Sequence, residues 1–146
     1  MDYENSKFII ASGPVIIENG KVLLNRHGET EADQRFWKFV GGRVELADVE
    51  IDGDALEIAC KREVKEEMGL DIEIIIPIKP MLIKHPDKPN AYIILIHYLA
   101  KRLNEIMPGP DIIEYGWFDI DSLPENCAPN ISQVIVAYKE VWKRLK

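Results

Sequence analysis

"KREVKEEMGL", residues 61–70, places three glutamates and three basic residues on a few turns of a predicted helix and ends at a glycine. An α-helix turns by about 100° per residue, so Glu63, Glu66 and Glu67 fall within an arc of roughly 100° and point the same way. Ion pairs with Arg62 and its neighbours would make this an ordinary solvated face, each pair contributing a few tenths of a kcal/mol. The alternative is a site that requires concentrated negative charge, and the surrounding sequence decides between the two.

The helix that carries these glutamates has clear start and stop signals. Asp54 can cap the first turn, and Glu57 three residues later completes a capping-box pattern. Gly69 stands where a helix favours a left-handed C-terminal residue. One apolar stripe with three- and four-residue steps consists of Leu56, Ala59, Cys60, Val64 and Met68. The pattern therefore predicts an amphipathic helix with its carboxylates beside a buried face.

Strand-like segments lie on both sides of this helix. Asn19-Gly20 between two apolar runs predicts a β-hairpin, because both residues tolerate positive φ. Before the helix, the expected strands are residues 8–17, 22–26 and 36–40, with polar loops at 27–35 and 43–52. After it, the expected strands are residues 71–78, with Pro77 at an edge or bulge, 81–85, 91–100 and 114–120. An apolar stripe over 131–145, capped near Asn130, predicts a second helix. This order predicts an α/β fold, a mixed sheet with helices packed on its faces.

Composition limits the classes of protein that the chain can represent. Its 146 residues suit one domain, 1–146, and 47% hydrophobic with 29% charged residues is ordinary globular usage. A net charge of −7, with acids concentrated in 45–73, excludes a binder of large nucleic acids. Cys60 and Cys127 have neither zinc nor disulfide spacing. With no signal peptide and no long apolar run, we expect a cytoplasmic protein without a membrane partner.

A specific motif surrounds the three glutamates. "GGRVE" at 41–45 is followed by Gly53-Asp54, seven residues, and then Arg62-Glu63-Val64-x-Glu66-Glu67-x-Gly69-Leu70. This resembles the Nudix box: a glycine, five residues, a glutamate, seven residues, and Arg-Glu-aliphatic-x-Glu-Glu-x-Gly-aliphatic. "REVKEEMGL" would arise by chance about once in ten million starting positions. The resemblance implies a Nudix-type α/β/α sandwich with helices on both faces of a mixed sheet.

The sequence departs from the Nudix box at its first acid. Aligned on the seven-residue step to Arg62, that acid is Asp54, and the preceding gap grows from five residues to eleven through a loop insertion at 46–52. A competing alignment keeps the spacing from Gly42 and selects Asp48, but it breaks the step to Arg62. We prefer Asp54, which by resemblance pairs with Arg62.

The same insertion imitates a calcium loop. Asp48-x-Glu50-x-Asp52-Gly53 follows the start of an EF-hand. Position twelve of that loop would be Ala59, where a bidentate glutamate is required, and no helix precedes it. Calcium binding at this loop is therefore not favoured.

The resemblance implies a pyrophosphohydrolase that cleaves a nucleoside diphosphate linked to another group, or a nucleotide. Divalent metal ions counter the phosphate charge and acidify the attacking water in such reactions. By resemblance, Glu66 and Glu67 are catalytic metal ligands, and Glu63 is a further catalytic metal ligand or orients the base. The Gly41 carbonyl completes the site and Arg62 supports it. Mg²⁺ is the expected cofactor, because carboxylate oxygens suit it, and Mn²⁺ is the second candidate.

Residues for substrate binding are less sharply indicated. Arg26 and Arg35 are candidates for phosphate, Trp37 for stacking on a base, and Asp111 or Glu114 for a fourth carboxylate. His27, His85 and His97 show no metal or catalytic spacing. Pro86, sixteen residues after Leu70, resembles a proline that ADP-ribose hydrolases of the family carry about fifteen residues after the box.

The sequence leaves the substrate and the assembly undecided. ADP-ribose-like compounds and nucleoside triphosphates both stay open as substrates. The alternatives to an enzyme are a Nudix-like domain that binds a nucleotide without cleaving it and an unrelated acidic interaction module. A homodimer is compatible with all three.

Overall fold

The computed structural model describes residues 2–145, in which seven strands form one mixed sheet. The strand order is β3-β2-β1-β6-β5, with β4 paired to β1 and β7 paired to β2. The β1–β6 pair is parallel and the other pairs are antiparallel. The strands are β1 (Lys7–Glu18), β2 (Lys21–His27), β3 (Lys38–Phe39), β4 (Gly42–Arg43), β5 (Ile72–Lys84), β6 (Ala91–Arg102) and β7 (Ile112–Asp119). The helices are α1 (Glu31–Arg35), α2 (Leu46–Glu50), α3 (Ala55–Met68) and α4 (Ile131–Leu145).

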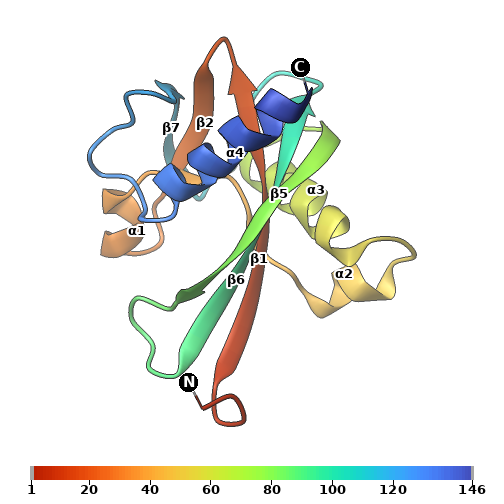
Figure 1. Cartoon of the computed structure of the whole chain (residues 1–146), viewed down its shortest axis with the longest axis vertical. Helices are drawn as coiled ribbons and strands as arrows, with labels where there is room; N and C mark the ends of the chain where they lie inside the picture. Colours follow the sequence, from red (N-terminus) through yellow and green to blue (C-terminus); the bar gives the residue numbers. More distant parts are fainter. Residues whose placement is uncertain (1, 146) are drawn as a thin grey trace.

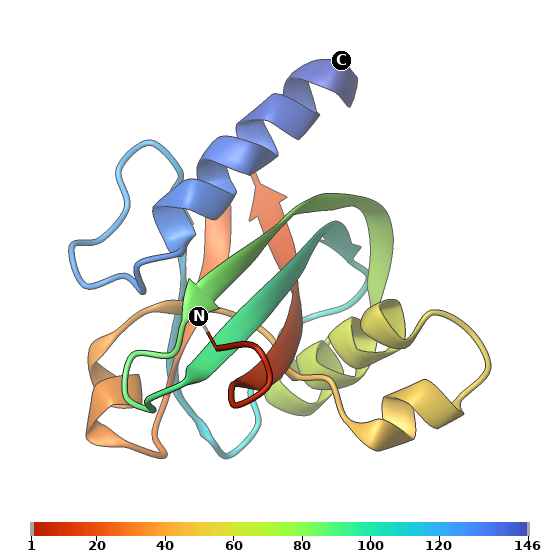
Figure 2. The same ribbon diagram turned by 60° about the horizontal axis from the view of Figure 1, so that its bottom comes forward.

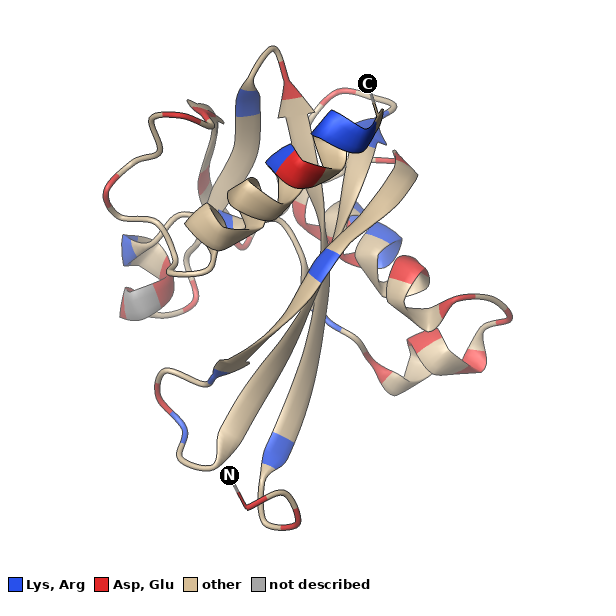
Figure 3. Ribbon diagram, viewed as in Figure 1, with Lys and Arg blue, Asp and Glu red and all other residues tan. Residues whose placement is uncertain are grey.

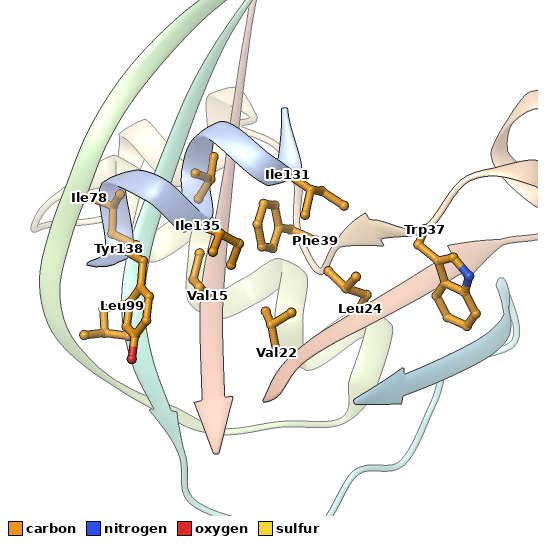
Figure 4. Packing of buried hydrophobic residues seen from close by; sticks show 11 residues of the cluster. Val15, Val22, Leu24, Trp37, Phe39, Ile78, Leu99, Ile131, Ile135 and Tyr138 are labelled. Atoms are coloured by element: carbon orange, nitrogen blue, oxygen red, sulfur yellow. The ribbon is translucent and has the colours of Figure 1, made fainter. Parts of the chain in front are cut away.

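Alternation along β1 sends its side chains into two cores on opposite faces of the sheet. Val15 packs with Ile131 and Ile135 of α4, as Figure 4 shows. The next residue, Ile16, belongs to the cluster that contains Val64 and Met68 of α3. The two long helices therefore cover opposite faces of the sheet (Figure 1), and the predicted α/β/α sandwich is confirmed.

The strongest local signals act as predicted. Asn19 and Gly20 have φ of 52° and 76° and close the hairpin between β1 and β2. Asp54 caps α3 by accepting bonds from the N–H groups of Leu56 and Glu57. Gly69 ends α3 in the left-handed region with φ of 65°. The helix with the three glutamates is thus fixed at both ends.

Several short elements differ from the expectation. Residues 31–35 and 46–50, expected as loops, form α1 and α2. Thr30 caps α1 through the Asp33 N–H, and Glu45 with Asp48 forms a capping box at α2. The segments 71–78 and 81–85 merge into β5, whose register shifts between Ile78 and Met81. Pro77 lies on this edge strand, as predicted.

Beyond the two helices, β1, β5 and β6 continue as a three-stranded projection (Figures 1 and 2). We call residues 7–11, 79–84 and 91–95 the arm. Phe8 stacks on Tyr92 with ring centroids 5.6 Å apart, and Tyr3 lies against Phe8 at 4.9 Å. Register pairs link Ile10 to Ile94 and Ile94 to Leu82 across all three strands.

The two cysteines occupy different environments. Cys60 is fully buried among the α3 core residues, and burial raises the pKa of its thiol to about 12. Cys127 is half-buried, and its backbone bridges to Trp37. Neither forms a disulfide. Across residues 2–145, the helices are too short or too polar to cross a membrane.

Candidate active site

The turn before β4 brings backbone unusually close to β1. Gly41 has φ of 148°, and a Cβ on it would lie 2.7 Å from the Ser12 carbonyl oxygen. A Cβ on Gly13 would overlap the Val40 carbonyl oxygen. Only glycines allow this approach. It also presses Gly42 against α3, where a Cβ would overlap the carboxylate of Glu63.

Glu67 is buried and held by donors on other elements. Its Oε2 lies 3.1 Å from Asn25 Nδ2 and 3.1 Å from His27 Nε2, both on β2, and its Oε1 accepts from the Gly41 N–H at 3.3 Å. The bond to Glu67 raises the pKa of His27 despite the opposing effect of burial. Asn25 is fully buried. These contacts fix the orientation of the Glu67 carboxylate.

Glu63 and Glu66 share one arginine. Arg62 Nη1 lies 2.8 Å from Glu63 Oε1 and 3.3 Å from Glu66 Oε2. Burial raises the pKa of Glu63, Arg62 opposes this, and the charges of Glu67 and Glu66 raise it further. The Glu66 side chain is 60% exposed and can therefore rotate toward a ligand. Arg62 thus orients two of the three carboxylates from one side.

Asp48, not Asp54, is the partner of Arg62, so the preferred alignment is wrong at this position. Arg62 donates from Nε to Asp48 Oδ1 at 2.8 Å and from Nη2 to Asp48 Oδ2 at 2.9 Å. Asp48 is 1% exposed, and its bonds to Arg62 lower its pKa. Asp54 serves only as the cap of α3. The additional residues therefore lie between Asp48 and Arg62, and the spacing of Asp48 from Gly42 is that of the Nudix box.

All three glutamates line one pocket of about 200 Å³. The residues that complete it come from two loops, the end of β2 and the start of β7: His27, Glu29, Gly109, Pro110, Asp111 and Ile112. Asp111, predicted as a fourth carboxylate, is among them, whereas Glu114 forms an ion pair with Arg26. Within residues 2–145, no three acidic, histidine or cysteine side chains are already close enough together to hold a metal ion. The predicted carboxylates therefore line one pocket, but their side chains are not arranged around a common metal position.

His27 and Glu29 line the pocket and Asn25 bonds to Glu67, and none of these three residues has a role in the sequence-based hypothesis. Asn25 and His27 lie two apart on β2 and therefore on one face of that strand. The sequence feature that could have identified them is this pair of polar residues, two apart, directly after the apolar run "VLL". Glu29 gives no comparable signal, because it lies in a polar loop.

The predicted substrate-binding residues lie outside this pocket. Trp37 is 7% exposed and packs edge-on against Phe118, with ring centroids 4.6 Å apart. The Arg26 guanidinium lies 5.0 Å from the centre of the Trp37 ring, and that of Arg35 lies 5.8 Å from the Phe36 ring. A role of Arg26, Arg35 and Trp37 in substrate binding stays a prediction.

A larger cavity, of about 1030 Å³, lies between α4 and the ends of β1 and β6. Its lining includes Leu99, Tyr138 and Trp142 but no glutamate of α3. The carboxylates therefore belong to the smaller pocket. His97, which is buried against Phe39, belongs to neither, and burial lowers its pKa to about 4.

Comparison with known proteins agrees with this fold. The family profile described as NUDIX domain matches residues 9–138. The MutT protein from Methanosarcina mazei Go1 is similar in structure with a TM-score of 0.77 and 20% identity, over 95% of this chain and 98% of that chain. The MutT NUDIX hydrolase from Burkholderia pseudomallei gives 0.74 and 22%, over 90% and 98%. An ADP-ribose pyrophosphatase from Streptococcus suis gives 0.58 and 21%, over 91% of each chain. No curated protein matches.

Proposed function

The chain belongs to the NUDIX family of hydrolases, and on that premise we propose that it is a metal-dependent pyrophosphohydrolase of nucleoside diphosphate derivatives. One observation carries the proposal: Glu63, Glu66 and Glu67 line a single pocket next to the Gly41-Gly42 turn. A solvated helix face would leave all three in water. Here Glu67 is buried and Glu63 nearly so. Concentrated, partly desolvated negative charge favours a bound cation.

The residues fit a hard divalent cation. Glu63, Glu66 and Glu67 supply carboxylate oxygens, with the Gly41 carbonyl as a further ligand, and Mg²⁺ prefers such ligands, with Mn²⁺ as the second candidate. When bound, the ion neutralises phosphate charge and lowers the pKa of an attacking water. Arg62 orients Glu63 and Glu66. Asn25 and His27 orient Glu67.

The acidic lining of the pocket limits how a phosphorylated substrate can bind. Several acidic groups line the pocket, so a phosphorylated substrate requires the metal and the nearby bases to reach it. Arg26 and Arg35 are the candidates for phosphate and Trp37 for the base. ADP-ribose-like compounds are the first choice, supported by Pro86 and by the likeness to the Streptococcus suis ADP-ribose pyrophosphatase, and nucleoside triphosphates are the second.

A substrate panel with Mg²⁺ tests the proposal. It spans ADP-ribose, nucleoside triphosphates, sugar nucleotides and dinucleotides, with the nucleotide products, separated by ion-exchange chromatography, as the readout. Glu66→Gln and Glu67→Gln should each lower turnover at least about a hundredfold, since each removes a group that stabilises charge. Glu57→Gln, on the same helix but outside the pocket, is the matched control and should stay near wild type.

The same panel also tests the domain that binds a nucleotide without cleaving it. That alternative rested on Asp54 as the partner of Arg62 and on the lengthened loop, and the buried Asp48–Arg62 pair removes the first of these two reasons. Tight binding of a panel member without turnover at any metal concentration would favour the alternative over hydrolysis.

A further inference from the structure

The short helix α2 exposes apolar side chains that no contact within the chain requires. Leu46 is 83% exposed, and Val49 and Ile51 are also exposed. Asp48, between them, is buried and anchors the helix on Arg62. The apolar residues are therefore held outward on a fixed support. Exposed apolar groups clustered in this way are typical of an interaction surface.

The arm continues this apolar surface. Ile10 and Leu82 are exposed and flank Ile94 in one row across β1, β6 and β5. Ser12, two residues after Ile10, bonds to the Leu56 carbonyl of α3, so Ile10 faces the α3 side of the sheet.

The arm is tied directly to the segment that enters α2. The Val44 N–H donates to the Ile10 carbonyl at 2.8 Å, only two residues before Leu46. The two sets of exposed side chains therefore belong to one region. We call Ile10, Leu46, Val49, Ile51 and Leu82 the α2 surface.

Acidic and basic residues near the α2 surface lie on different elements. From residue 44 to residue 60 the chain has acidic residues and no lysine or arginine. On the arm, Lys84 lies two residues after Leu82 and therefore on the same face, whereas Lys7 lies three residues before Ile10 and faces the other side. The arm strands carry no acidic residue (Figure 3). An acidic helix and a basic arm on one chain are complementary to each other when two copies meet.

Pairing of sheet edges is the other common way for strands to associate, and β5 is poorly suited to it. β5 is the edge strand beside β6, and Pro77 and Pro80 remove backbone donors from it. At β5, the face of the arm is therefore better suited to a partner than the edge.

We propose that a second copy of the chain covers the α2 surface, with α2 of each protomer packed on the arm of its partner. A two-fold axis makes both contacts at once, since each copy offers the same helix and the same arm. Apolar residues form the centre, and the acids near α2 lie opposite Lys84 of the arm. This assembly is independent of the catalytic proposal, because the α2 surface contains no residue of the carboxylate pocket.

Sedimentation velocity of the full chain over about 1 to 200 μM tests the contact, a range that resolves micromolar dissociation constants. Wild type should change from monomer to dimer. Val49→Asp and Leu82→Asp should each raise the dissociation constant at least about tenfold, because a charge would enter the apolar centre. Val136→Asp, at an exposed position on α4, is the matched control and should associate like wild type. Circular dichroism melts show that each variant is folded.

A charge reversal tests which elements meet. Glu50→Lys on α2 and Lys84→Glu on the arm should each weaken the dimer, and the two together should restore it at least in part. Wild type that stays monomeric throughout the range would overturn the proposal. So would folded Val49→Asp and Leu82→Asp variants that dimerise unchanged, or a double reversal that associates no better than either single change.

Discussion

At the scale of single residues, the pair of Asp48 and Arg62 connects the added loop to the candidate site. Asp48 is a buried residue of α2 and bonds twice to Arg62, whose remaining donor Nη1 reaches Glu63 and Glu66. Loss of Asp48 would leave a partly buried guanidinium without its main partner. Stability and catalysis should both depend on this contact.

Asp48→Asn should lower the free energy of unfolding by about 3 kcal/mol at neutral pH, the usual cost of breaking a buried ion pair. Arg62 lowers the pKa of Asp48 below its ordinary value of 3.8, so the unfolded chain binds the proton more readily. The contribution is therefore complete above that value and is lost as the pH falls through the lower folded-state pKa. Urea unfolding of wild type and variant at a series of pH values should show the gap closing in acid.

Asp54→Asn provides the comparison for this prediction. Asp54 only caps α3, and asparagine is also a good cap, so the free energy of unfolding should change by less than about 1 kcal/mol. If Asp54→Asn lowered the free energy of unfolding more than Asp48→Asn, Asp54 rather than Asp48 would correspond to the first acid of the Nudix box.

At the scale of elements, the approach of the Gly41-Gly42 turn to α3 determines where Glu63 points. A methyl group on Gly42 would meet only the end of a flexible side chain, whereas one on Gly13 would meet the Val40 backbone. The same chemical change therefore has two different consequences, one for the site and one for the fold.

Gly42→Ala should lower turnover at least about tenfold, since displacing a catalytic group by about 1 Å can cost a hundredfold. Its free energy of unfolding should stay within about 1 kcal/mol of wild type, because Glu63 can move aside. Gly13→Ala should destabilise the protein by more than that. Steady-state rates and urea unfolding of both variants test this, and an active Gly42→Ala variant would show that the position of Glu63 is not critical.

The elements also show what the sequence could predict. α3, α4 and the hairpin at Asn19-Gly20 have long periodic patterns or specific turn residues, and all three were predicted correctly. α1 and α2 have five residues each, too few for a periodic signal, and depend on capping bonds. Helical spacing could predict that the three glutamates point the same way, and the resemblance to the Nudix box suggested that they share a site; their role stays a prediction. A single sequence could not show on which side of Asp48 the added residues lie, because residues added to a loop produce no hydrophobic periodicity.

At the scale of the whole molecule, an acidic chain gathers several carboxylates at one pocket. Net charge is −7, and the site adds local repulsion between Glu63, Glu66 and Glu67. Bound cations would relieve that repulsion in the folded state only. Thermal stability should therefore depend on divalent ions.

Mg²⁺ at about a hundredfold excess over its dissociation constant should raise the melting temperature by roughly 5 to 10 °C, from about 2.7 kcal/mol of binding linkage. Differential scanning calorimetry with Mg²⁺ and then EDTA measures this. A Glu63→Gln, Glu67→Gln double variant is the control and should lose most of the shift. An unchanged melting temperature in wild type would argue against a cation site at these carboxylates.

The contrast between Cys60 and Cys127 offers a natural attachment point for a spectroscopic reporter. Cys60 is fully buried with a thiol pKa of about 12, so a maleimide dye should react more readily with the half-buried Cys127, although burial also raises the pKa of that thiol. Cys127 is bridged to Trp37, whose indole lies beside Arg26. The fluorescence of a dye on Cys127 should change when a ligand binds near Arg26. The binding of non-hydrolysable nucleotides could then be followed without engineering the chain.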